Sequence, residues 1–287
     1  MTGRKKRVGI AVGIVLVIIG GLVIFESVPY SPLKSEFQAD VDRLTSAENT
    51  VFDEGELFSE SDFADVPEAI QRFIQHSGYI GTPKMTYIRL SMKDVQFNLD
   101  GRDMTIDYTL YDFAVRPNRT ALIETSFYGI PFDGYDYLVD MNAGMRGVLG
   151  KVATVVDQTG ELMDKAQLVT LLGESPLCPS IWLTDYVTLE HIDQNHARAT
   201  ITYQGITASG IFTVNEAGEI ATFTTDDRAM SVSGGGMDYT PWTGVFADYR
   251  ENDRGVLFPW HIQAMWNLPQ GDYVYFDGDV DTVEYGG

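Results

Sequence analysis

The sequence predicts an α+β fold: a large curved antiparallel sheet, half-barrel-like, with covering helices, preceded by one transmembrane helix. Three observations predict it. An uncharged apolar run covers residues 8–25. Roughly ten later segments alternate apolar and polar residues as strands do, and two segments repeat apolar residues at helical spacing. Because the strands come in consecutive runs, we expect an antiparallel sheet, and a sheet of this size should curl with the helices on its concave face.

The apolar run follows the basic cluster Arg4-Lys5-Lys6-Arg7. At 1.5 Å per residue it spans about 27 Å, close to the hydrocarbon thickness of a bilayer. A cleaved signal peptide is the alternative, but the run is longer than a usual h-region and no small-x-small site follows it. Positive charge before the span predicts a cytoplasmic tail at 1–7, a signal-anchor helix at 8–25 and an extracytoplasmic remainder, hence a single-pass protein of the cell membrane.

The next segment, residues 26–64, is predicted to be an acidic stalk. It begins with a short amphipathic helix, since apolar residues recur there at helical spacing: Leu33, Phe37, Val41 and Leu44. The extracytoplasmic α+β domain is then expected to cover residues 65–287. Its first helix should start at a capping box made by Asp65 and Glu68 and end at Gly78.

Strand patterns fill most of the remaining sequence. Asp100-Gly101 is a hairpin signal between the alternating run that starts after Lys84 and the run at 104–115. A second helix is expected from Glu161 to about Leu172, ended by Gly173. The other predicted strands are 119–128, 135–141, 186–192, 198–203, 207–214, 220–225, 246–251, 257–266 and 273–285.

Composition limits the partners. The formal net charge is −21, so nucleic acid and anionic lipid headgroups would be repelled. Cys178 is the single cysteine, which excludes an intramolecular disulfide and favours a buried structural thiol. We expect no nucleic-acid partner, and no protein partner is indicated.

The sequence has no cofactor or metal motif. It lacks a P-loop, a dinucleotide fingerprint, a G-x-S-x-G elbow and a pair of histidines at ligand spacing. Asp277, Asp279 and Asp281 begin like a calcium loop, but Thr282 stands where the required glycine should be. We therefore expect no cofactor and no metal.

Two sets of residues are candidates for function. Asp248, Arg250 and His261 are the trio that a hydrolase would use, although surface ion pairs along neighbouring strands explain the same residues. Aromatic residues are more suggestive, because one face of a curved sheet would gather them around a hollow suited to an apolar ligand. These candidates are Trp182, Trp242, Tyr249, Trp260 and Trp266; core packing is the alternative.

Three separated segments carry a family resemblance: V-P-E-A-I-Q-R-F-I-Q-H-S-G-Y-I-G-T-P at 66–83, P-W-T-G-V-F-A-D-Y-R-E at 241–251, and F-P-W-H-I-Q-A-M-W-N-L-P-Q-G-D-Y at 258–273. Together they resemble an uncharacterised family of membrane-anchored prokaryotic proteins known as a domain of unknown function, over about residues 64–285. The resemblance implies no site residues. More loosely, the predicted topology resembles the periplasmic lipoprotein-carrier half-barrel, which holds acyl chains under helices.

These observations favour a membrane-anchored extracytoplasmic binding protein for a lipid or another apolar ligand over an enzyme. The alternatives are an exported hydrolase that uses scattered Asp, Arg and His residues, and an envelope adaptor that binds another protein. Fold-level similarity by itself decides none of them.

Overall fold

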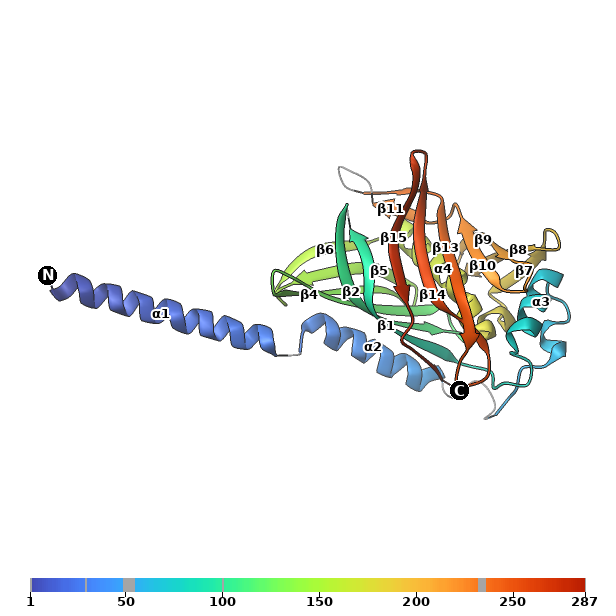
Figure 1. The fold of residues 1–287 in the computed structure, drawn as a ribbon, viewed down its shortest axis with the longest axis horizontal. Coiled ribbons are helices and arrows are strands. Elements are labelled where there is room, and N and C mark those ends of the chain that lie inside the picture. The colour runs from blue at the N-terminus through green and yellow to red at the C-terminus, as the bar shows by residue number, and fades with distance from the viewer. Residues whose placement is uncertain (1, 29, 49–54, 100, 232–235, 287) are drawn as a thin grey trace.

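The computed structural model describes residues 2–28, 30–48, 55–99, 101–231 and 236–286 (Figure 1). Its centre is a 14-stranded sheet with the order β6-β5-β4-β3-β2-β1-β15-β14-β13-β10-β9-β8-β7, and β16 also pairs with β1. The strands on the N-terminal side are β1 (Tyr87–Leu99), β2 (Arg102–Phe113), β3 (Asn118–Phe127), β4 (Ile130–Val139), β5 (Asn142–Leu149) and β6 (Ala153–Thr159). Those on the C-terminal side are β7 (Val187–His191), β8 (His196–Tyr203), β9 (Ile206–Val214), β10 (Ile220–Thr225), β13 (Trp242–Glu251), β14 (Leu257–Leu268), β15 (Gly271–Asp279) and β16 (Thr282–Gly286).

The predicted α+β class and the antiparallel sheet are confirmed. Each pairing within the sheet is antiparallel, and the sheet is not closed into a barrel because β6 and β7 form its two ends. The Leu99–Arg102 pair confirms the hairpin predicted at Asp100-Gly101, although Asp100 itself lies outside the described residues. A small separate sheet joins β11 (Ala229–Ser231) to β12 (Met237–Tyr239).

Helix α4 (Glu161–Glu174) lies inside the curve of the sheet, where it contacts β3–β6 on one limb and β8–β10 on the other (Figure 1). Acidic residues in its first turn, Glu161 and Asp164, suit the positive end of the helix dipole. The prediction that Gly173 ends this helix is wrong. A Cβ on Gly173 would lie 2.8 Å from Cδ1 of Phe223, so the glycine permits close packing of helix on sheet.

Helix α2 (Pro32–Glu48) is the predicted amphipathic helix, but it covers the other face of the sheet. Phe37 packs edge-on against Tyr111 and Tyr135, with ring centroids 6.0 and 5.9 Å apart. Tyr135 and its neighbour Asp136 point to opposite faces of β4, because side chains alternate along a strand. The expectation that helices cover the concave face therefore holds for α4 and not for α2.

Part of the predicted stalk packs into the domain. Phe58 and Phe63 are buried at 1% and 3% exposure, and Phe58 lies edge-on to Tyr79 at 6.0 Å. The short helix η1 (Glu60–Phe63) carries a capping box made by Ser59 and Asp62. Residues 49–54 of that stalk lie outside the described residues.

Helix α3 (Glu68–Ser77) follows and packs near β8, β9 and β14. The capping box predicted for it is absent, since its N-cap is Pro67 and no side chain caps it. Its end is as predicted: Gly78 has φ 76°, the left-handed conformation that glycine adopts without steric cost. Two further short helices, η2 (Ser175–Leu177) and η3 (Pro179–Leu183), lead from α4 to β7.

Strands β5 and β6 have no counterpart in the predicted set. Glycines weaken the strand pattern of β5, but packing requires them. A Cβ on Gly144 would lie 2.6 Å from the Tyr137 hydroxyl, and one on Gly147 would lie 2.8 Å from the Phe132 ring. The single strand predicted at 273–285 is divided into β15 and β16, which pair with different parts of β1.

Helix α1 (Thr2–Ser27) contains the predicted membrane span and extends away from the sheet (Figure 1). Its described apolar side chains are exposed, for example Leu16 at 63% and Val17 at 75%. Among the residues that the structure describes, no helix meets the length and apolarity needed to cross a membrane. Both hydrophobic cores are built from Leu33 onward, so residues 30–287 hold the packing that a domain needs to fold by itself.

Candidate functional site: a cavity between the sheet and helix α4

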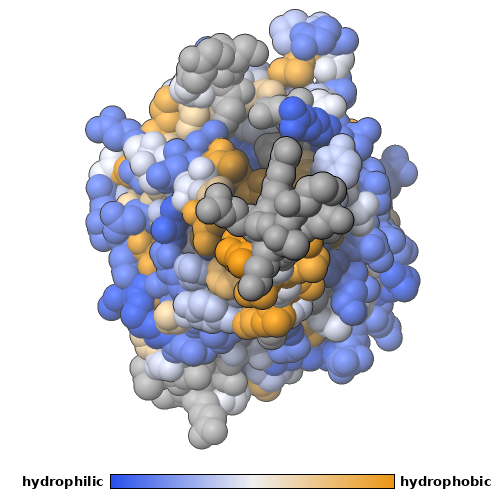
Figure 2. Space-filling model, turned by 90° about the vertical axis from the view of Figure 1, so that its left-hand side faces the viewer, coloured by the Kyte–Doolittle hydropathy of each residue, from blue (hydrophilic) through white to orange (hydrophobic). Residues whose placement is uncertain are grey.

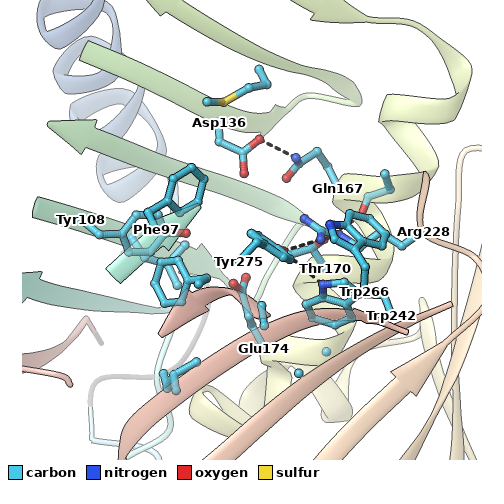
Figure 3. A pocket seen from close by; sticks show the side chains of 18 of the residues that line it. Phe97, Tyr108, Asp136, Gln167, Thr170, Glu174, Arg228, Trp242, Trp266 and Tyr275 are labelled. Atoms are coloured by element: carbon cyan, nitrogen blue, oxygen red, sulfur yellow. Dashed lines mark hydrogen bonds between the residues drawn. The ribbon is translucent and has the colours of Figure 1, made fainter. Parts of the chain in front are cut away.

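A cavity of about 260 Å³ lies between the concave face of the sheet and α4 (Figure 3). Strands β1, β2, β13, β14 and β15 and one face of α4 supply most of its walls, and β3–β6 and the segment around Arg228 complete them. The walls are mainly aromatic and aliphatic; they include Leu90, Met92, Phe97, Leu110, Ile123, Met145, Met163, Trp242, Phe246, Trp266 and Phe276. This combination of an apolar wall and a few polar groups is typical of a ligand site.

Regular secondary structure places these side chains. On β13, Trp242, Gly244 and Phe246 are two residues apart and share the inner face. On α4, Met163, Gln167 and Thr170 recur at intervals of three or four residues, so they lie on the face toward the sheet.

One side of the cavity contains a buried polar cluster around Arg119 of β3. Its Nε and Nη2 donate to the two carboxylate oxygens of Glu174 at 2.6 and 3.1 Å, a bidentate pair. Its Nη1 donates to Asp136 Oδ2 at 2.9 Å and to Gln167 Oε1 at 3.2 Å. Its Nη2 also donates to the Tyr108 hydroxyl at 2.7 Å, and Gln167 Nε2 donates to Asp136 Oδ1 at 2.5 Å. The cluster therefore ties β2, β3 and β4 to α4.

The charges of the cluster follow from burial and proximity. Burial by itself would lower the pKa of Arg119, but the neighbouring Glu174, Tyr108 and Asp136 outweigh it and raise that pKa. Burial raises the pKa of Asp112, the nearby Glu174 raises it further, and Arg119 at 3.9 Å only partly opposes the shift. Burial and Glu174 therefore favour the protonated form of Asp112, and Arg119 pairs with the carboxylates of Glu174 and Asp136.

A second arginine, Arg228, lies in an aromatic box on the other side. Its guanidinium carbon is 4.8 Å from the ring centroid of Trp242, 5.1 Å from that of Trp266 and 5.8 Å from that of Tyr275. Arg228 Nε donates to Thr170 Oγ1 at 2.9 Å and Nη1 donates to the Tyr275 hydroxyl at 2.6 Å (Figure 3). Cation–π contacts and two hydrogen bonds therefore fix its position.

Two of the five predicted aromatic ligand contacts, Trp242 and Trp266, line this cavity. Trp182 lies in the core instead, edge-on to Phe73, with its Nε1 donating to Ser175. Tyr249 donates its hydroxyl to the Ile220 carbonyl oxygen at 2.8 Å, and Trp260 packs under Arg250 at 5.4 Å. These last three aromatic residues are not in the cavity wall.

The predicted catalytic trio is not assembled by contacts in this structure. Asp248 pairs with Arg250 at 3.0 Å, while His261 Nδ1 lies 2.7 Å from Asp279 and its Nε2 lies 3.4 Å from Asp277. Within the described part of the chain, no three His, Cys, Asp or Glu side chains are grouped to hold a metal ion.

Sequence reasoning missed the polar residues of the cavity. Arg119, Asp136 and Glu174 are far apart in the chain and belong to no motif. One signal was present: Gln167 and Thr170 interrupt an otherwise apolar face of α4, where a polar side chain requires a buried partner.

The fold and the site define a cavity-bearing domain in which an open antiparallel sheet curves around one helix. Residues 56–278 match the family described as "Family of unknown function (DUF6544)", and the chain belongs to that family. This confirms the resemblance to a domain of unknown function; the match begins eight residues earlier and ends seven earlier than the expected 64–285. A search of curated proteins found no match.

Two solved structures are similar to the chain at low identity. One is described as an outer membrane lipoprotein-sorting protein domain from Vibrio parahaemolyticus, with TM-score 0.38 and 7% identity, covering 77% of this chain and 92% of that one. The other is a DUF1329 family protein from Desulfovibrio piger, with TM-score 0.39 and 12% identity, covering 80% of this chain and 94% of that one. The expected similarity to a lipoprotein carrier is found in the first match, and at these scores neither match carries an argument about function.

Proposed function

We propose that this protein binds an apolar ligand with a small polar end, such as a lipid, in the cavity between the sheet and α4. The cavity itself carries the proposal: it measures about 260 Å³ and its walls are mainly aromatic and aliphatic. Water gains few hydrogen bonds against such walls, so an apolar molecule that displaces it is stabilised.

The size of the cavity supports a ligand over a packing defect. Protein interiors have few voids larger than one water molecule. A ligand with an apolar body would fill this space and bury the apolar walls, which stabilises the folded state.

We also propose that the domain is held at the outer side of the cell membrane by residues 8–25. The exposed apolar side chains of α1 support this, as do three exposed side chains on the hairpins of β3–β6: Tyr128, Ile130 and Val152. Lys151 beside Val152 donates to the carbonyl oxygen of Phe25 at 2.7 Å, so this hairpin meets the C-terminal end of α1. Figure 2, which looks along α1 toward the domain, shows apolar side chains near the centre of the view and mainly hydrophilic ones around them.

The binding proposal is tested with residues 30–287, which hold both hydrophobic cores. The probe is N-phenyl-1-naphthylamine, a neutral dye whose fluorescence rises in apolar sites. The test variant is Ala264→Phe, because Ala264 lines the cavity and a larger ring would occupy it. The control is Ala247→Phe on β13, whose residue pairs with His261 and is not in the cavity wall.

We expect saturable binding by the wild type and by Ala247→Phe. Ala264→Phe should weaken binding by about tenfold or more, since filling the space removes at least roughly 1.4 kcal/mol of affinity. Native mass spectrometry of the fragment, purified without detergent, should show an apolar adduct. A bare mass together with no dye binding would overturn the proposal.

A further inference from the structure

We propose that Arg228 binds the anionic end of the ligand, which makes the ligand a singly charged amphiphile of the long-chain carboxylate class. This inference rests on the proposed function, since the apolar part of the ligand would occupy the cavity. Beyond the proposed function, it names the chemical class of the ligand and identifies Arg228 as the residue that recognises the charged end.

The geometry of Arg228 leaves donors available. A guanidinium has five N–H groups. The N–H group on Nε donates to Thr170, and one N–H group on Nη1 donates to Tyr275. Nη2 has no acceptor among the described residues, and Arg228 lines the cavity, so a ligand there can accept a hydrogen bond from it.

Tyr275 provides a second donor at the same place. Its hydroxyl oxygen accepts from Arg228 Nη1 at 2.6 Å and from Trp242 Nε1 at 3.1 Å, which uses both lone pairs (Figure 3). The hydroxyl proton therefore needs an acceptor, and none is found for it in the part of the chain that the structure describes. An anionic oxygen beside Arg228 would accept from both residues.

The charge balance distinguishes Arg228 from Arg119. Arg119 is neutralised by Glu174 and Asp136 at 2.6 and 2.9 Å. Arg228 has no carboxylate within ion-pair distance among the described residues, although both arginines line the cavity. Arg228 is thus the cavity-lining arginine whose positive charge no described carboxylate balances.

The same balance defines the charge of the ligand. A phosphate monoester carries nearly two negative charges at pH 7, and one arginine beside an acidic cluster compensates only one. A quaternary ammonium would find the rings of Trp242 and Trp266 already stacked on Arg228. A carboxylate on an alkyl chain fits both the charge and the apolar walls.

The experiment measures displacement of N-phenyl-1-naphthylamine from residues 30–287 by dodecanoate, methyl dodecanoate and dodecyltrimethylammonium at pH 8. The variants are Arg228→Gln, which removes the charge, and Arg228→Lys, which keeps it without the planar fork. The control is Arg254→Gln, which removes an exposed arginine stacked on Tyr285 at 4.6 Å, outside the cavity wall.

In Arg228→Gln, dodecanoate should bind about tenfold to a hundredfold more weakly, as expected for losing a charge-assisted hydrogen bond. Dye and methyl ester should bind as in the wild type, which also shows that the variant is folded. Arg228→Lys should be intermediate, and Arg254→Gln should be unchanged.

Unchanged dodecanoate affinity in Arg228→Gln, with the dye still bound, would overturn this inference and leave the proposed function intact. Tighter binding of dodecyltrimethylammonium than of dodecanoate would overturn it as well. If neither the dye nor dodecanoate binds the wild type, the proposed function fails and the inference fails with it.

Discussion

Arg119 and Glu174 form a bidentate ion pair that joins the sheet to the helix it encloses. The two N–H···O distances are 2.6 and 3.1 Å, and the Arg119 side chain is only 3% exposed. The pair lines the cavity, so the same contact fixes α4 and shapes the site. Charges removed from water in this way are costly when either partner is lost.

We therefore expect Arg119→Met to reduce the free energy of unfolding by about 3 kcal/mol, because the partly buried carboxylates of Glu174 and Asp136 would lose their cation. The double variant Arg119→Met/Glu174→Met should lose less than the sum of the two single variants. Denaturant unfolding of residues 30–287 measures both.

A matched control is Arg89→Met, which breaks the exposed ion pair with Glu284. Exposed pairs contribute about 0–1 kcal/mol, so this change should be small. Equal losses from Arg89→Met and Arg119→Met would contradict the role assigned to the buried pair.

Asp112 makes stability depend on pH. Burial raises its pKa in the folded state above the unfolded value, so the folded state binds the proton more tightly. The resulting stability is present in full below the unfolded pKa, near 4, and is lost as pH rises toward the folded pKa. Asp112→Asn does not titrate and should keep that stability.

We expect Asp112→Asn to unfold about 2–4 °C above the wild type at pH 8, with the difference shrinking toward pH 4. Thermal unfolding across this range is the measurement. Asp185→Asn, at an exposed position, is the control and should follow the wild type. A wild type that gains stability over Asp112→Asn as pH rises would contradict the assignment.

Phe58 tests whether the segment before α3 belongs to the domain. It is 1% exposed and contacts Phe63 and Tyr79. Phe58→Ala should destabilise the protein by about 3–5 kcal/mol, as expected for emptying a buried aromatic position. Leu57→Ala, at a side chain that is 49% exposed, should change stability by less than about 0.5 kcal/mol. A stalk without packing would give no loss in either variant.

Membrane attachment through residues 8–25 predicts that the full chain stays with the membrane pellet after alkaline carbonate extraction, while residues 30–287 are released. The side of the membrane on which the domain lies can be measured with the variant Ser46→Cys. Position 46 is exposed, and the natural Cys178 is buried and should not react. A membrane-impermeant maleimide should label Ser46→Cys in intact cells. Labelling only after lysis would contradict an extracytoplasmic domain.

Local patterns predicted most elements of the fold. Alternation with a period of two located β1–β4, β7–β10 and β13–β15, and helical spacing located α2, α3 and α4, because each pattern reports which side of an element is buried. These signals failed where tertiary packing overrides local preference. Gly144 and Gly147 occur in a strand because aromatic rings fill the space beside them, and Gly173 continues a helix because Phe223 packs against it.

The site was predictable only in part. An aromatic-lined hollow followed from the number of late aromatic residues, and Trp242 and Trp266 do line the cavity. Trp182, Tyr249 and Trp260 have the same local character but lie outside it. Trp182 belongs to the short helix η3, and Tyr249 and Trp260 lie beyond the parts of β13 and β14 that line the cavity. A sequence pattern gives the side of a strand that is buried and not how far along the strand a cavity extends.

The sequence by itself determined the class of the fold, the apolar N-terminal run, the acidic charge and the absence of an intramolecular disulfide, because each depends on residue type and local order. The tertiary structure decided which polar groups meet. Arg119 reaches Glu174 across 55 positions, and Arg228 reaches Tyr275 across 47. Such pairs form only when distant strands and a helix are packed together, so burial and charge at the cavity are properties of the fold and not of any local segment.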